Sequence, residues 1–255
     1  MSGPTIAGVY DFWLGGGQHL REDREVAQEI ARKYPSVPVH IRAAQEFHLR
    51  AARWCAAELG ISRFVRGGHF TTLPSGRNTH DAAREVIPGA RVIYAYRDRS
   101  AYEFSAGLLD WDEGVIPALS GDGGILGLEP VRAMLAEGEP VCLIAGMLLH
   151  FADSERAASR VARVAAALPP GSVFVVSMTM AGTRPEADEI LSMFTPARTY
   201  RHTAADLTGW LEDAGLKIVE PGVIDVRVVP RPGQPTLGPP MGDLGFIGGA
   251  LARKP

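Results

Sequence analysis

The amino-acid sequence predicts an α/β fold with a mostly parallel sheet, on three observations. From residue 61 onward, strand-like apolar runs alternate with helical patterns, as in chains whose parallel strands are joined by right-handed crossovers. Two of the runs, 141–145 and 173–176, are apolar without alternation, which is typical of strands covered on both faces. The first run leads into Gly67 and Gly68, and glycines at this point let the backbone approach a ligand closely.

The first 60 residues have helical patterns, with apolar side chains at helical spacing and no strand-like alternation. The expected helices are 5–14, 21–33 and 40–59. The glycines at 15–17 end the first of these helices, and Gly60 ends the third. We therefore expect 1–60 to form a helical cap or lid on a core that spans 61–255, the two making one integrated domain.

The core shows the alternation element by element. Strands are expected at 63–65, 91–96, 115–119, 141–147, 172–178 and 216–219. Helices are expected at 78–86, 100–109, 130–136, 153–168, 185–194 and 203–214. The proline-rich stretch 229–242 predicts a long loop, and 246–252 a final edge strand.

Composition excludes several classes of function. Hydrophobic residues make up 46% of the 255 residues and charged residues 22%, as in globular proteins, and the net charge of −3 provides no basic surface for nucleic acid. No apolar run is long enough to span a membrane, and no secretion signal is evident. Cys55 and Cys142 are far apart in sequence and outside any metal-binding pattern, so we expect no metal. We expect a cytoplasmic protein with a small-molecule substrate and allow for a homodimer.

Several short motifs occur in a compatible order and spacing along nearly the whole chain. They are VYDFWLGG at 9–16 with DRE at 23–25, LPS at 73–75 with NTHD at 78–81, LLHF at 148–151, and PGS at 170–172. This set resembles the VYDYLLGG–ADRE, LPT–NVHE, VLHF and PGS motifs of the S-adenosyl methyltransferase family of high-GC Gram-positive bacteria, formerly a domain of unknown function. The resemblance implies a Rossmann-like class I methyltransferase fold with a seven-stranded sheet whose last strand is antiparallel. It also implies S-adenosylmethionine as cofactor and methyl transfer to a small molecule.

The departures from the family pattern fall on positions that face the cofactor. The family's first strand ends in FLDIGSG, whereas this chain has FVRGGHF at 64–70 and a longer loop, which puts Arg66 at the position of the aspartate. At the end of the second strand the family has YVDNDP, whose first carboxylate binds the ribose hydroxyls, and here Tyr96 stands in its place. Arg66 could bind an anionic group of a ligand, or it could pair with an acid of this chain such as Asp98.

The resemblance and the position of each residue give a set of cofactor-binding candidates. They are Tyr10, Gly15, Gly16, Gly67, Gly68, Tyr96, Asp122 and Gly123. Asp122 corresponds to the acid that this fold usually places near the adenine amine, although Asp-Gly is also a common turn pair. Gly67 and Gly68 could likewise form a plain strand–helix turn. The aromatic residues at 10, 12 and 13 could line a substrate site, but core packing is the favoured interpretation.

The catalytic candidates are His69, His150 and Tyr10. Each histidine follows a central strand at its carboxyl end, and imidazole can move protons near neutral pH. A backbone hydrogen bond within a turn is the alternative role for His150. Among the other histidines, His80 is expected to be structural and the three at 40, 48 and 202 to be exposed.

Three hypotheses of function remain open on the sequence alone. The chain could methylate a small molecule with S-adenosylmethionine held in a remodelled site. It could instead have lost methylation and perform proton-transfer, cyclisation or isomerisation chemistry, or it could bind a ligand without catalysis. No nucleophile elbow and no phosphate-binding loop of the nucleoside triphosphatases occurs in the sequence.

Overall fold

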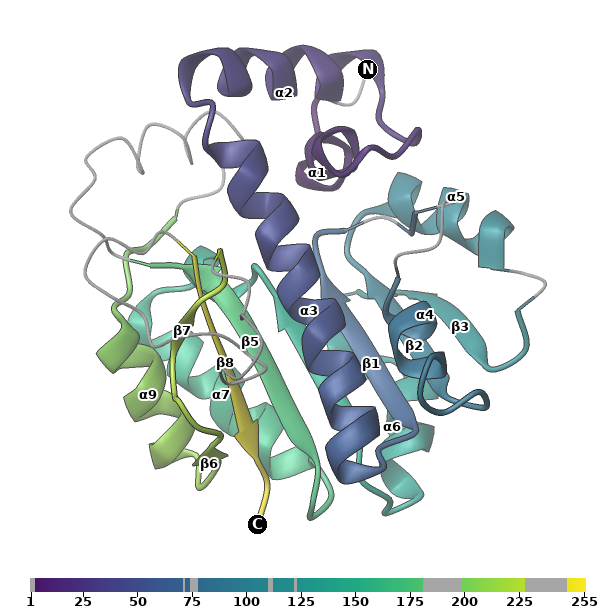
Figure 1. Ribbon diagram of the computed structural model, residues 1–255, viewed down its shortest axis with the longest axis vertical. Coiled ribbons are helices and arrows are strands. Elements are labelled where there is room, and N and C mark those ends of the chain that lie inside the picture. Colours follow the sequence, from purple (N-terminus) through teal and green to yellow (C-terminus); the bar gives the residue numbers. More distant parts are fainter. Residues whose placement is uncertain are drawn as a thin grey trace.

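The structure is a computed structural model that describes residues 3–70, 72–73, 78–109, 112–121, 123–180, 199–227 and 247–255. A central sheet carries helices on both faces, and two further helices lie beyond the carboxyl ends of its parallel strands (Figure 1). The helix predicted at 185–194 and the loop predicted at 229–242 lie outside the described residues.

The N-terminal helices are α1 (Ile6–Leu14), α2 (Arg21–Lys33) and α3 (Val37–Leu59). Thr5 caps α1 by accepting a hydrogen bond from the backbone N–H of Gly8, and α1 ends at Gly15 in the left-handed conformation (φ 80°). Helix α3 has a proline in its first turn and ends at Gly60, also left-handed (φ 65°). It crosses the sheet in front in Figure 1, with α1 and α2 beyond its upper end. The cap therefore includes one helix that also covers the sheet.

The sheet contains the predicted parallel strands at nearly the predicted bounds. They are β1 (Arg63–Gly68), β2 (Arg91–Tyr96), β3 (Val115–Leu119), β4 (Cys142–Gly146) and β5 (Val173–Thr179), followed by the short β6 (Lys217–Ile218) and β7 (Ile224–Asp225) and by β8 (Ile247–Arg253). Their order within the described part of the chain is β3-β2-β1-β4-β5-β8-β6, with β7 also pairing with β8. Since β6 and β7 pair with different parts of β8, they share one position, and the sheet has the seven positions of the methyltransferase fold.

The final strand is antiparallel, as expected, but the prediction that it lies at the edge is wrong. Strand β8 pairs with β5 on one side and with β6 and β7 on the other. Its residues from Ile247 to Ala252 are all buried. A strand whose residues are apolar and buried on both faces is typical of the interior of a sheet, and the composition of this segment agrees with that position.

Helices cover the two faces and create two hydrophobic cores. Helices α3, α4 (Thr79–Arg84) and α5 (Arg99–Leu109) pack on one face, and α6 (Glu129–Ala136), α7 (Ser154–Ala167) and α9 (Ala204–Asp213) on the other. Short 3₁₀ turns, η1 (Ile125–Gly127) and η2 (Leu149–Phe151), follow β3 and β4. Side chains alternate between the cores along each strand, since successive residues point to opposite faces. In the described ranges no helix is long and apolar enough to cross a membrane.

Candidate functional site

The two glycines predicted to lie in a turn after β1 are part of the strand itself. Gly67 and Gly68 pair with Ala95 and Tyr96 of β2, and Gly68 pairs with Gly146 of β4. Gly68 has φ 143°, and a Cβ there would lie 2.5 Å from the carbonyl oxygen of Gly146. Close packing of neighbouring strands therefore requires a glycine at 68, whether or not a ligand is bound.

Two buried carboxylates, both part of the sequence motifs, hydrogen-bond segments of the cap to one another. Asp11 accepts hydrogen bonds from the backbone N–H of Gln18 (2.7 Å) and His19 (3.1 Å). A Cβ on Gly16 would lie 2.0 Å from the carboxylate of Asp11. Asp23 similarly accepts from the backbone N–H groups at positions 5 and 20, at 2.7 and 2.8 Å. Gly16 thus makes room for a side chain of its own cap.

The aromatic residues of α1 pack into the core, as the favoured interpretation expected. Tyr10 and Trp13 are buried, with ring centroids 6.1 Å apart, and the indole N–H of Trp13 donates to the carbonyl of Ala27 (3.2 Å). Burial raises the pKa of the Tyr10 hydroxyl well above its usual value, so this side chain is neutral at physiological pH.

Tyr96 lies inside an aromatic cluster on the α3 face. It is fully buried, its ring centroid is 4.8 Å from that of Phe70, and its hydroxyl hydrogen-bonds to Thr72. Tyr94 also packs against both Phe70 and Tyr96, and its hydroxyl lies 2.8 Å from Nδ1 of His80. His80 is therefore structural, as predicted. Burial raises the pKa of Tyr96 to about 12, so the position presents a neutral hydroxyl that is already bonded.

Arg66 is a buried cation with few partners. Its side chain is 4% exposed and its guanidinium lies 4.9 Å from the centre of the Phe70 ring. Nη2 is 3.5 Å from Oε1 of Gln45, while Nη1 has no hydrogen-bond partner. Within the described residues no carboxylate pairs with Arg66. The expected alternative of a pair with Asp98 is wrong, because Asp98 instead accepts from Ser100 and from the backbone N–H of Ala101.

His48 lies beside Arg66, over the same glycine of β4. A Cβ on Gly146 would be 2.5 Å from Nη1 of Arg66 and 2.7 Å from Cε1 of His48. Nε2 of His48 is 2.7 Å from Oγ of Ser177, and Nδ1 has no partner among the described residues. Burial, then the charges of Arg66 and Arg50, hold the pKa of His48 well below its usual range. His48 is therefore neutral near pH 7.

The expectation that three histidines are exposed is wrong. His40, His48 and His202 are 6%, 2% and 3% exposed. His48 is four residues from both Ala44 and Ala52, which are buried on the inner face of α3, so helical spacing alone could have indicated its burial. His202 is held by the carbonyl of Ala152, 2.8 Å from Nε2.

The two catalytic candidates His69 and His150 lie at the carboxyl edge of the sheet, on either side of Phe151. The ring centroid of Phe151 is 5.5 Å from that of His69 and 4.2 Å from that of His150. Burial lowers the pKa of His69 to about 4 and that of His150 to about 3. Neither ring nitrogen of His150 has a partner among the described residues. Both imidazoles are neutral at pH 7 and are weak bases, because a low pKa means low proton affinity.

The remaining candidates lie on the cap and in the loop after β3. Gly15 ends α1 and has no atom near its Cβ position. Asp122 lies outside the described residues, and its neighbour Gly123 borders a pocket of about 410 Å³ beside α7. Sequence reasoning missed the three arginines of this pocket, Arg97, Arg160 and Arg163. The last two are three residues apart on one helix, a spacing visible in the sequence.

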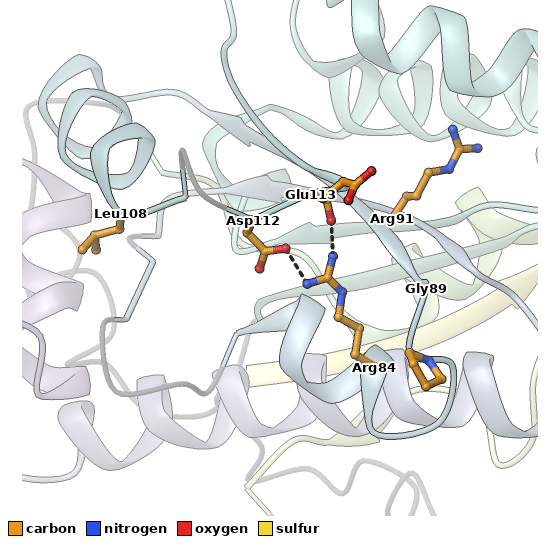
Figure 2. A pocket seen from close by; sticks show the side chains of 8 residues that line it. Arg84, Gly89, Arg91, Leu108, Asp112 and Glu113 are labelled. Carbon is orange, nitrogen blue, oxygen red and sulfur yellow. Dashed lines mark hydrogen bonds and ion pairs between the residues drawn. The ribbon is translucent and has the colours of Figure 1, made fainter.

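A second cavity, of about 810 Å³, lies at the amino ends of β2 and β3, away from these residues (Figure 2). Figure 2 shows Arg84 pointing toward Asp112 and Glu113, and its Nη2 donates to the carbonyl of Glu113 at 2.7 Å. Arg84 pairs with Asp112 inside this cavity, and Arg91 pairs with Glu137 outside it, so we assign the cavity a structural role. Across the described ranges, no three His, Cys, Asp or Glu side chains gather into a metal-binding cluster.

Comparison with known proteins identifies the family. The S-adenosyl methyltransferase family matches residues 1–255. A proposed methyltransferase from Thermobifida fusca YX is 26% identical, with a TM-score of 0.83 over 99% of this chain and 95% of that one. A DUF574 family protein from Streptomyces avermitilis MA-4680 is 29% identical, with a TM-score of 0.82 over 99% and 98%.

More distant structures share the fold. The magnesium protoporphyrin IX methyltransferase of Synechocystis PCC 6803, determined with bound SAH, is 13% identical with a TM-score of 0.53 over 97% of this chain and 93% of that one. No curated protein matches the chain. The family match over the full length, together with the sheet order and the cap, establishes that this chain belongs to the S-adenosyl methyltransferase family.

Proposed function

We propose that this chain binds a small anionic molecule at the carboxyl ends of β1 and β4 and does not hold S-adenosylmethionine through the family's contacts. The observation that carries the proposal is Arg66, a buried guanidinium without a carboxylate partner among the described residues. By the resemblance, it stands where the family has an aspartate. A charge in this setting is costly unless it is paired, and a bound anion would supply the pair.

The charge of the site opposes the cofactor. S-adenosylmethionine carries a sulfonium, an ammonium and a carboxylate, for a net charge of +1. Exchanging a carboxylate of the protein for a guanidinium reverses the sign of the charge that would face the two cationic groups in the family's binding mode. Two like unit charges about 6 Å apart repel by roughly 3 kcal/mol at an effective dielectric constant of about 20. Arg50, whose charge also acts on His48, adds to the positive potential.

The end of β2 also does not suit a ribose. A carboxylate there would accept hydrogen bonds from both hydroxyls, each contributing about 1.5–3 kcal/mol. Tyr96 instead is buried against Phe70 and shares its hydroxyl with Thr72. These residues do not fit the cofactor as the family binds it.

The side chains around Arg66 suit a carboxylate or a phosphate. A guanidinium fork can donate two parallel hydrogen bonds to either group. Gln45 and the unpartnered Nδ1 of His48 are further polar groups beside Arg66. The imidazoles of His69 and His150 lie at the same edge of the sheet, but their low pKa values make them weak proton acceptors for a bound molecule.

Methyl transfer is the second candidate function, favoured by membership of the family over the whole chain. The reaction mainly requires that donor and acceptor be aligned in a dry pocket, so it needs no particular catalytic residue. Methyl transfer by this chain would depend on contacts from the protein backbone to hold the cofactor.

Calorimetric titration separates the two candidates. We expect no measurable heat with S-adenosylmethionine or S-adenosylhomocysteine at millimolar concentration, because the site lacks the carboxylates with which the family binds the ribose and the methionine portion. Micromolar binding of either compound would refute the proposal and support methyl transfer.

A positive test uses benzoate and inorganic phosphate as probes. At least one should raise the melting temperature of the natural protein and have no effect on Arg66→Met. The matched control is Arg53→Met, which changes a surface arginine of α3 that pairs with Glu85 and should leave the probe effect intact.

A further inference from the structure

A pocket between η1 and α7 combines three arginines with an apolar floor. Arg97 follows β2, whereas Arg160 and Arg163 project from α7, and the pocket measures about 410 Å³. Ile125, Leu148 and Leu149 contribute to the floor. The volume is within the range of pockets that bury small organic ligands, roughly 300–1,000 Å³.

This pocket and Arg66 lie on opposite faces of the sheet. Phe70 and Ile144, beside Arg66, belong to the core under α3, whereas Ala145 and Phe174 of the pocket belong to the core under α7. Side chains of successive strand residues point to opposite faces, so β1 and β4 separate the two places. Arg66 and this pocket therefore lie on different faces of the sheet, although the charge of Arg97 also acts on His69 at the carboxyl edge.

The arginines of the pocket are unneutralised. Among the described residues, Arg97, Arg160 and Arg163 form no ion pair, whereas Arg156 on the same helix lies 3.5 Å from Asp153. Arg156, Arg160 and Arg163 follow one another at spacings of four and three residues, where like charges repel. Desolvation and then the charge of Arg160 lower the pKa of Arg97, which indicates that these cations are close. The three arginines are exposed to solvent, where an anion placed between their guanidinium groups would offset the repulsion among them.

We propose that this pocket is a binding site for a small molecule that carries a phosphate or carboxylate on an aromatic or other apolar body. The arginines bind the anionic group through charge-assisted hydrogen bonds. The apolar body lies against Ile125, Leu148 and Leu149, where its burial removes apolar surface from water. Recognition thus requires both parts of the ligand.

Calorimetry on the full chain at one fixed, low ionic strength tests this with four probes. They are 1-naphthyl phosphate, 1-naphthoate, 1-naphthol and inorganic phosphate. We expect at least one of the two naphthyl anions to bind at least tenfold more tightly than both 1-naphthol and inorganic phosphate. The tighter of the two anions identifies the head group.

Variants then locate the binding. Replacing both Arg160 and Arg163 by glutamine should weaken the preferred naphthyl anion at least tenfold, and the control Arg156→Gln, outside the pocket, should change it less than twofold. The titrations are repeated in the variant Arg66→Met, which removes the anion site of the proposed function. The preferred naphthyl anion should still bind to this variant, and the double replacement of Arg160 and Arg163 should weaken that binding at least tenfold, so that failure here and failure of the proposed function remain distinguishable.

Each of three results would overturn the inference: naphthyl anions that bind no better than 1-naphthol, binding that the double variant does not weaken, or no binding of either naphthyl anion to Arg66→Met. Tighter binding of a DNA oligonucleotide than of any naphthyl anion, sensitive to the same double variant, would reassign the surface to nucleic acid and also refute a small-molecule site.

Discussion

Replacing Gly68 with alanine is expected to lower the free energy of unfolding by about 2–6 kcal/mol. The residue has φ 143°, a conformation that L side chains rarely adopt, and such strain costs about 1–3 kcal/mol. The new Cβ would also lie 2.5 Å from the carbonyl oxygen of Gly146, a backbone atom in a neighbouring strand, and overpacking adds about 1–3 kcal/mol. Urea denaturation followed by circular dichroism measures the change.

Gly107→Ala is the matched control, because this glycine lies in α5 with open space at its Cβ position. Alanine there should raise stability by about 0.5–1 kcal/mol, since glycine is the weaker helix former. If Gly68→Ala proves as stable as the natural protein, the close approach of β1 and β4 described here is incorrect.

Replacing Arg66 with methionine is expected to stabilise the ligand-free protein by about 1–4 kcal/mol. Burial lowers the pKa of Arg66 from 12.5 to about 10, which corresponds to roughly 3 kcal/mol against its charged form. The pKa of Arg66 is lower in the folded state than in the unfolded state, so burying the charged guanidinium destabilises the fold. This destabilisation is present in full below about pH 10 and decreases as the pH rises from there toward 12.5. Methionine keeps an apolar contact with Phe70 without a charge.

Urea denaturation at pH 7, in a buffer without carboxylate or phosphate, measures this gain. The variant Arg66→Gln is a useful comparison, since it removes the charge but keeps a polar group that still needs partners, and it should gain less. A loss of more than about 1 kcal/mol in Arg66→Met would show that the guanidinium is already satisfied in the folded chain, and the anion proposal would fail.

Periodicity and turn residues predicted most of the elements. The apolar runs of β4 and β5 and the helical spacing of α7 follow from local sequence, and their bounds agree with the structure within one or two residues. The place of β8 could not be read in the same way, because pairing partners depend on segments far apart in the chain. The surroundings of Arg66 likewise come from α3, β2 and β4, so the sequence could not decide whether Arg66 pairs with Asp98 before the elements were assembled.

The amino-acid sequence by itself determined the fold class and the family, because motifs and hydrophobic periodicity are local properties of the chain. Only the tertiary structure decided that Gly68 is required by a neighbouring strand, that Tyr96 is closed off by Phe70 and Thr72, and that Arg66 has no acidic partner among the described residues. The physical reason is that packing, desolvation and charge pairing depend on which residues become neighbours in space, and the order of residues in the chain does not state this.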